Sequence, residues 1–314
     1  MIKNENSWEN VIKWTCSYHC LRRNDGNKKI SNEQLSIEVG EFGAELQSIK
    51  KDGLEYLWQG NPDFWGRRAP VLFPIVGKLK HGRYTYDDAS FQLSGHGFAR
   101  DKAFKLIDGS DEAVIYELKS DKETKIVYPF DFRLRITYKL HGNQLSVNWE
   151  VKNLDETEMY FGIGAHPAFN VPLGSGKFED YSLVITPEKN RQLIPLNVSE
   201  GTIDLAKRQV SKDNIFNLSR ALFKHDALVF ETPEATQVVL SNSVNDRSVK
   251  VSWEHMPFVG LWSPYPNEAP FVCIEPWCGI ADDDNTDGDL TTKFGINMLS
   301  PGKKFKAGYT ITIN

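Results

Sequence analysis

The chain has 314 residues, 40% of them hydrophobic, and a formal net charge of −5. This length can bury a large core in one or two domains, and the acidic balance argues against nucleic acid as the main partner. No apolar run approaches the roughly 20 residues of a membrane helix, and the first residues lead into no signal-peptide-like region. We therefore expect a cytoplasmic protein with neither a nucleic-acid nor a membrane partner.

Residues 1–28 differ in pattern from the rest of the chain. Ser7 can cap a short helix with Trp8 on its apolar face, but that face is too short to specify a docked element. We interpret 1–28 as an N-terminal extension, either an appendage or the product of an upstream start codon. A docking segment for another protein is the alternative. No low-complexity linker interrupts residues 29–314, so we expect a single domain there.

Short runs of alternating apolar and polar residues dominate from residue 30 onwards and indicate β-strands. The strands are expected over 35–39, 132–138, 145–151, 238–240, 249–253 and 309–313. Gly142-Asn143 suits a hairpin turn, and one short helix is expected over 214–223. Many strands joined by short turns predict an all-β fold, a large antiparallel β-sandwich whose concave face could hold a sugar-sized ligand.

Four cysteines, Cys16, Cys20, Cys273 and Cys278, are too few for a disulfide framework in a chain this long. The second pair lies near Glu275, but neither pair has the spacing of a zinc ribbon or finger. We therefore expect no metal site and interpret Cys273 as a small buried strand residue.

An acidic run occupies residues 282–289 and at first resembles a calcium loop. An EF-hand loop needs glutamate at its twelfth position, which counted from Asp282 is Lys293. We interpret the run as an acidic surface loop.

Two histidines lie in settings suited to chemistry. His96 stands between Gly95 and Gly97, which let the backbone turn tightly and a ligand approach closely. A turn histidine bonded to a nearby carbonyl would give the same pattern. His166 ends an apolar strand, where the competing interpretation is a core histidine with its hydrogen bonds satisfied.

Glu275 lies inside the apolar run 270–277, where a glutamate needs a partner. Partial desolvation would raise its pKa and make it a better base, whereas the alternative is a structural ion pair with Arg68 or Arg100. Two histidines and a carboxylate are what proton transfer at a small polar substrate needs.

Residues 66–102 hold a local excess of basic side chains in an acidic chain. Such a cluster can hold a phosphate through arginine contacts, or it can be an ordinary solvated face. Arg68 and Arg100 border apolar segments, so they are the better candidates for a site.

Three stretches together resemble the aldose 1-epimerase (galactose mutarotase) superfamily, most closely its LacX-like branch. They are Gly95-His96-Gly97-Phe98-Ala99-Arg100, His166-Pro167-Ala168-Phe169-Asn170 and Ile274-Glu275-Pro276-Trp277. The resemblance covers roughly residues 30–314. It implies a galactose mutarotase-like β-supersandwich that interconverts the α and β anomers of a hexose without a cofactor. We expect a small-molecule sugar, free or phosphorylated, as partner, and a monomer or homodimer.

The resemblance also implies roles for the three titratable residues. Glu275 is expected to be the general base that takes the proton from the C1 hydroxyl. His166 is expected to be the general acid that protonates the ring oxygen. His96 would hydrogen-bond near that oxygen and polarise it.

Five further residues are expected to bind substrate. Arg68 and Asp226 would hold sugar hydroxyls, and Arg100 would be an additional substrate contact. Trp277 or Phe98 would offer an apolar face to the sugar ring.

The chain departs from the better-known galactose mutarotases, which have an asparagine-arginine pair at Arg67-Arg68 and a tyrosine at Ala168. The motif with Arg100 also recurs in hexose-6-phosphate epimerases of the superfamily. Two alternatives therefore stay open: a hexose-6-phosphate 1-epimerase, and a non-catalytic carbohydrate-binding protein on the same fold.

Overall fold

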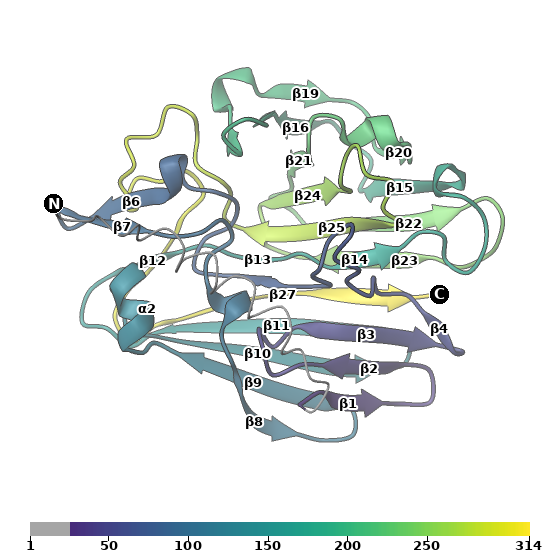
Figure 1. Ribbon diagram of the computed structural model, residues 1–314, viewed down its shortest axis with the longest axis horizontal. Helices are drawn as coiled ribbons and strands as arrows, with labels where there is room; N and C mark the ends of the chain where they lie inside the picture. Colours follow the sequence, from purple (N-terminus) through teal and green to yellow (C-terminus); the bar gives the residue numbers. More distant parts are fainter. Residues whose placement is uncertain (1–25) are drawn as a thin grey trace, which may run out of the picture.

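The structure is a computed structural model that describes residues 26–314 (Figure 1). The helix expected at Ser7 and the cysteines Cys16 and Cys20 lie outside the described residues. Antiparallel strands make up most of the regular structure of the described part, whose one α-helix is α2 (Lys122–Val127). The helices of residues 26–314 are all too short and polar to cross a membrane.

Two large sheets form the body of the molecule. In spatial order, the nine-stranded sheet contains β20 (Ile215–Asn217), β15 (Tyr181–Thr186), β22 (Thr236–Asn242), β23 (Val249–Trp253), β27 (Lys304–Ile313), β11 (Gln144–Asn153), β10 (Phe132–His141), β9 (Ala113–Lys119) and β8 (Lys105–Gly109). The eight-stranded sheet contains β19 (Gln209–Ser211), β16 (Arg191–Ile194), β21 (Leu228–Glu231), β24 (Phe258–Trp262), β25 (Phe271–Cys278), β13 (Ile163–Ala165) and β5 (Val71–Leu72), with β14 (Ala168–Asn170) also paired to β25.

Smaller sheets complete the structure. The four-stranded sheet contains β1 (Lys28–Ser31), β2 (Ser36–Val39), β3 (Leu46–Lys51) and β4 (Leu54–Glu55). The two-stranded pairs are β6 (Arg83–Tyr86) with β7 (Ala89–Gln92), β12 (Met159–Phe161) with β26 (Asn297–Leu299), and β17 (Leu196–Asn197) with β18 (Thr202–Ile203). The 3-10 turns are η2 (Lys80–Gly82), η3 (Ala99–Asp101), η4 (Phe178–Asp180), η5 (Leu205–Lys207) and η6 (Arg220–Phe223).

The alternating runs form strands because one set of side chains is buried in the main core. Phe132, Leu134 and Ile136 of β10 are fully buried, while the residues between them are partly exposed. The turn that joins β10 to β11 is Gly142-Asn143, as expected, with Gly142 at φ +55°. The strands expected over the six ranges are confirmed, and so is the antiparallel all-β class.

β25 lies near the centre of the molecule (Figure 1) and separates two environments. Val272 and Ile274 point into the main core, whereas Cys273 and Trp277 belong to two smaller apolar clusters on the other face. Because side chains alternate along a strand, Glu275 shares this second face. The strand therefore presents one face to the core and the other to the candidate site.

The prediction of a short helix over 214–223 is wrong. Residues Ile215–Asn217 form edge strand β20, paired with β15 so that Phe216 lies opposite Leu183, and only Arg220–Phe223 turn as a 3-10 helix. Pairing with a distant strand outweighs the local pattern here.

The interpretation of 282–289 as a surface loop is wrong for its first residue. Asp282 is 3% exposed, lies 2.8 Å from Lys293 Nζ, and accepts a 2.9 Å hydrogen bond from the Lys80 amide. Asp283 accepts from the Leu205 amide, and the carboxylate of Asp284 accepts from side chains of the neighbouring β17–β18 hairpin. These carboxylates connect the end of β25 to neighbouring segments.

The turn that carries His96 packs directly on the chain after β5. The Phe98 amide donates to the Phe73 carbonyl at 3.0 Å, and Gly97 has φ +69°. A Cβ on Gly97 would lie 2.2 Å from the Phe73 oxygen, which no packing can accept. Glycine is therefore required at 97 by the close approach of two backbones.

We expect Gly97→Ala to destabilise the fold more than Gly53→Ala, a matched control at φ +78° with nothing within 4 Å of an added Cβ. Both substitutions place an alanine in the left-handed backbone region, which costs about 1 kcal/mol. Only Gly97→Ala adds overlap, which typically costs a further ~1–3 kcal/mol. Denaturant unfolding measures both, and equal losses would contradict the packing argument.

Candidate active site

Three chain segments bring His96, His166 and Glu275 together. Gly164 pairs with Trp277 and Ala168 pairs with Cys273, so the intervening His166 lies across from Glu275. His166 Nε2 lies 3.2 Å from Glu275 Oε2. The ring of His96 meets that of His166 edge-on, with 5.6 Å between centroids. All three catalytic candidates therefore share one site.

Two tryptophans that sequence reasoning missed lie against His166. Trp65 stacks on the imidazole at 4.8 Å, and Trp262 meets it edge-on at 5.7 Å. Their own rings are 5.8 Å apart. In the sequence, Trp65 could have been found because it directly precedes the basic segment 66–102. Trp262 could not, because its position depends on pairing with Cys273 in the neighbouring strand.

Burial controls the protonation of His166 and Glu275, which we call the acid–base pair. Glu275 is 2% exposed, and burial raises its pKa well above the usual carboxyl range, with the charge of Asp226 raising it further. Burial also lowers the pKa of His166 to about 3, with the positive charge of Arg100 adding to the effect. Both shifts favour the uncharged forms, so we describe the contact as a hydrogen bond between a protonated carboxyl and a neutral imidazole.

His96 has a defined tautomer. Its Nδ1 accepts a 3.2 Å hydrogen bond from the Gly77 amide, so the proton of the neutral ring is on Nε2. Burial lowers the pKa of His96 well below its usual value, and His166 adds to this effect. His96 is therefore a neutral hydrogen-bond donor in the site.

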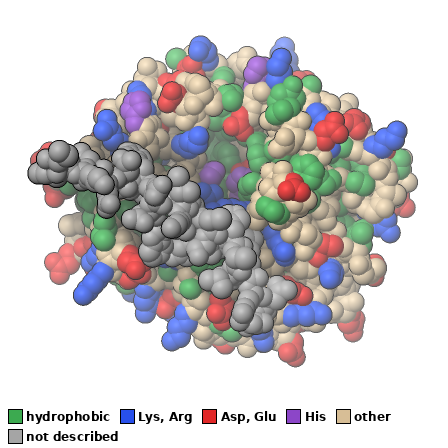
Figure 2. Space-filling view, in the orientation of Figure 1, with side chains coloured by type: hydrophobic (Ala, Val, Ile, Leu, Met, Phe, Trp, Pro, Cys, Tyr) green, Lys and Arg blue, Asp and Glu red, His purple; other side chains and the backbone are tan. Residues whose placement is uncertain are grey.

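Two arginines near the histidines share one carboxylate. Arg67 Nη2 lies 2.9 Å from one Asp101 oxygen, and Arg100 Nε lies 3.7 Å from the other. Burial and the charge of Arg67 lower the pKa of Arg100 to about 10. Figure 2 shows histidine side chains beside Lys and Arg side chains near the centre of this face. The charges of Asp101 and Glu45 both act on Arg100, so two acidic groups lie near the two guanidiniums.

Arg68 and Asp226 also lie close to the acid–base pair. The Arg68 carbonyl accepts from the Ala168 amide at 2.9 Å, next to the His166 segment, and its Nη1 donates to the Gln47 carbonyl at 2.6 Å. Asp226 is half-buried, has φ +72°, and acts on Glu275 through its charge. The sequence also allowed an ion pair of Glu275 with an arginine; in the structure Glu275 contacts His166, and the guanidinium of Arg100 lies beside Asp101.

Trp277 and Phe98 are held by packing. Trp277 is 7% exposed, and its Nε1 donates a 3.1 Å hydrogen bond to the Ala165 carbonyl. Its ring packs on Gly260, where an added Cβ would lie 2.5 Å from the ring. The ring of Phe98 meets Phe73 at 6.3 Å, beside the main core. Of the tryptophans, tyrosines and phenylalanines in the described range, Trp65 and Trp262 are those whose rings contact His166.

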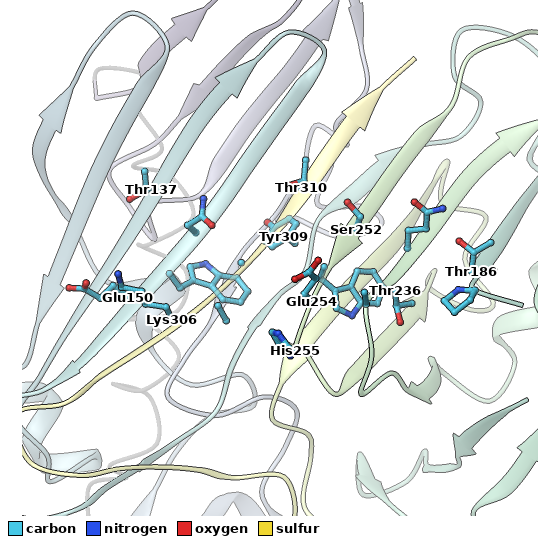
Figure 3. Close-up of a pocket in the computed structure, with 18 residues that line it drawn as sticks. Thr137, Glu150, Thr186, Thr236, Ser252, Glu254, His255, Lys306, Tyr309 and Thr310 are labelled. Atoms are coloured by element: carbon cyan, nitrogen blue, oxygen red, sulfur yellow. The ribbon is translucent and has the colours of Figure 1, made fainter. Parts of the chain in front are cut away.

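A groove of about 1080 Å³ lies on the nine-stranded sheet (Figure 3). Thr137, Ser252 and Thr310, from three different strands, are among the residues that line it. None of the eight site residues expected from the sequence lines this groove. It is separate from the cluster of His96, His166 and Glu275.

Comparison with known proteins identifies a family. The aldose 1-epimerase family pattern matches residues 28–292. The chromosomal LacX protein of Lactococcus lactis subsp. lactis is 36% identical over 296 residues, which cover 91% of this chain and 98% of that protein.

Solved structures agree in fold along almost the whole chain. A galactose mutarotase related enzyme from Lactobacillus acidophilus superposes with a TM-score of 0.90 at 42% identity, covering 92% of this chain and 97% of that one. A galactose mutarotase-like protein from Lactobacillus casei superposes with a TM-score of 0.86 at 32% identity, covering 92% and 100% of the two chains.

The raised pKa of Glu275 predicts how stability changes with pH. The folded state keeps the Glu275 proton at pH values where the unfolded chain has lost it, so the contribution of Glu275 to stability should fall as pH rises above about 4.3. The loss is about 1.4 kcal/mol per pH unit until the folded-state pKa is reached. Glu275→Gln removes this titration. The lowered pKa of His166 has the opposite effect on wild-type stability below about pH 6.5, so the contribution of Glu275 is read from the difference between wild type and Glu275→Gln.

The measurement is the melting temperature of wild type and Glu275→Gln across the same pH series. We expect the variant to gain on the wild type as pH rises. A difference that stays constant with pH would contradict the raised pKa.

Proposed function

The chain belongs to the aldose 1-epimerase family, and on that premise we propose that it interconverts the α and β anomers of a hexose by acid–base opening and closure of the ring. The observation that carries the proposal is the 3.2 Å contact between His166 Nε2 and Glu275 Oε2. Anomerisation moves protons to and from two oxygens of one small molecule, and a positioned acid–base pair suits that task.

The pair can hold its protons in two arrangements. Burial favours protonated Glu275 with neutral His166, and a proton shift along the hydrogen bond gives carboxylate with imidazolium. The two arrangements contain the same number of protons. A catalytic cycle that alternates between them therefore needs no proton from the solvent.

Ring opening uses the charged arrangement. The Glu275 carboxylate takes the C1 hydroxyl proton, the bond between C1 and the ring oxygen breaks, and His166 gives its proton to that oxygen. The products are the open-chain aldehyde and the neutral arrangement of the pair. After rotation about the C1–C2 bond, the reverse steps close the ring on the other face of C1.

The surrounding residues bind and orient the sugar in this proposal. His96 donates from Nε2 toward the ring oxygen, consistent with its bond from Gly77 to Nδ1. Arg68 and Asp226 hold hydroxyls. Trp65 and Trp262 offer apolar walls to the sugar ring, because their rings already contact the general acid. The reaction as written uses no cofactor.

We expect Glu275→Gln and His166→Asn each to reduce anomerisation by about 100- to 10,000-fold, the usual contribution of one acid or base. The measurement is the approach of fresh α-glucose or α-galactose to anomeric equilibrium, by polarimetry or NMR exchange. His141→Gln is the control, since His141 is an exposed residue at the end of β10.

Near-normal rates in Glu275→Gln would remove this residue from the base role. Sugar binding by the wild type without any acceleration would instead favour a carbohydrate-binding protein on the same fold.

A phosphorylated hexose is the second candidate substrate, on one specific observation. Arg67 and Arg100 share the Asp101 carboxylate, and the charges of both act on His96 and His166. Two guanidiniums whose charges act on both histidines are placed to hold a phosphate group of a substrate bound there.

Arg67→Gln tests this candidate. If the phosphate ester is the substrate, the variant should lose at least about tenfold in kcat/KM for glucose 6-phosphate, since charge-assisted hydrogen bonds contribute about 1.5–3 kcal/mol. The rate with free glucose should change little. Arg208→Gln, at an exposed arginine paired with Glu231, is the control. Equal losses on both sugars would argue against a phosphate contact.

A further inference from the structure

Cys273 adds a third buried ligand to the acid–base pair. It precedes Glu275 by two residues on β25, so the two side chains leave the strand on the same face. Its neighbour in the register is Ala168, two residues after His166. The ligand atoms of His166, Cys273 and Glu275 lie within 4.8 Å of one another. The spacing of the cysteines in the sequence did not indicate a metal site, because the third ligand, His166, comes from a distant segment of the chain.

The geometry of the pair suits a shared ion. Two ligands bound at about 2.0–2.1 Å with tetrahedral angles lie roughly 3.4 Å apart. The observed distance from His166 Nε2 to Glu275 Oε2 is 3.2 Å. His166 Nδ1 is buried and has no hydrogen-bond partner among the described residues. The hydrogen bond from the Glu275 carboxyl leaves the ring proton on Nδ1, so Nε2 is the nitrogen whose lone pair faces Glu275 and can bind a metal.

The donor set selects a class of cation. A thiolate, an imidazole and a carboxylate together suit Zn²⁺ and similar thiophilic ions, whereas Mg²⁺ and Ca²⁺ prefer oxygen ligands. Three protein ligands leave a fourth tetrahedral position for water or a sugar hydroxyl. The aromatic cluster around Cys273, which includes Trp58 and Phe271, limits access of bulk water to the ion.

We propose that His166, Cys273 and Glu275 form a binding site for Zn²⁺ or another thiophilic divalent cation, and that the bound ion inhibits anomerisation. Inhibition follows because the ion occupies the two groups that transfer protons. This inhibitory part rests on the proposed function. The binding part does not, and it can be measured on its own.

Binding is tested with Co²⁺ as a spectroscopic probe that is displaced by Zn²⁺. A thiolate-to-cobalt charge-transfer band is expected in the wild type and in Cys278→Ser, the control at the other buried cysteine of the same strand. The band should be lost or strongly weakened in Cys273→Ala. Cys273→Ser is the second variant, to be used if the alanine substitution disturbs the fold. All variants keep Cys16 and Cys20, so metal bound by these residues contributes equally.

Inhibition is tested by anomerisation rates against added Zn²⁺. The wild type and Cys278→Ser should be inhibited, and EDTA should restore them. Cys273→Ala should keep its basal rate and require at least about tenfold more Zn²⁺, because even outer-shell partners of a metal contribute 10- to 100-fold in affinity. Equal Zn²⁺ sensitivity in Cys273→Ala would overturn the inhibitory site.

The two arms separate the inference from the function on which it partly rests. The metal site would be overturned, even in an active enzyme, if the wild type showed no charge-transfer band. It would also be overturned if both Cys273 variants showed a band as strong as that of the wild type. A band that depends on Cys273 would support the site even in a protein that fails to accelerate anomerisation.

Discussion

The antiparallel pairing of the His166 segment with β25 is the constraint on which the site depends. Gly164 opposite Trp277 and Ala168 opposite Cys273 set the register that places His166 across from Glu275. A slip of one residue would turn Glu275 toward the main core, where a carboxyl would have no partner. The same register aligns Cys273 with the pair, so imidazole, carboxyl and thiol lie together because of one set of backbone hydrogen bonds.

A second constraint holds His96 against the end of β25. Gly77 is so close to the chain after β25 that an added Cβ would lie 2.5 Å from the Cβ of Ala281. The amide of Gly77 donates to His96 Nδ1, while its carbonyl accepts from the His96 amide at 2.8 Å. Asp282, paired with Lys293, anchors the same region. The turn that carries His96 and strand β25 are therefore connected through backbone contacts and one buried ion pair.

Burial links the stability of the site to its chemistry. Both members of the His166–Glu275 pair are more than nine-tenths buried, and burial raises one pKa and lowers the other. A desolvated carboxyl costs stability once it must ionise, yet the same desolvation makes it a stronger base. Trp65 and Trp262 enclose the imidazole on two sides, so the aromatic walls contribute to this dry environment and also suit the apolar face of a sugar.

Local pattern was enough to predict the strands, the β10–β11 turn and the chemical candidates His96, His166 and Glu275, because period-two alternation and an unusual polar residue in an apolar run are readable without neighbours. Long-range contacts decided the rest. Residues 215–217 became a strand because β15 pairs with them, and Asp282 became buried because Lys293 and Lys80 bind it. The places of Trp262 and Cys273 beside His166 depend on strand register, which links residues about a hundred positions apart and leaves no mark in either segment alone.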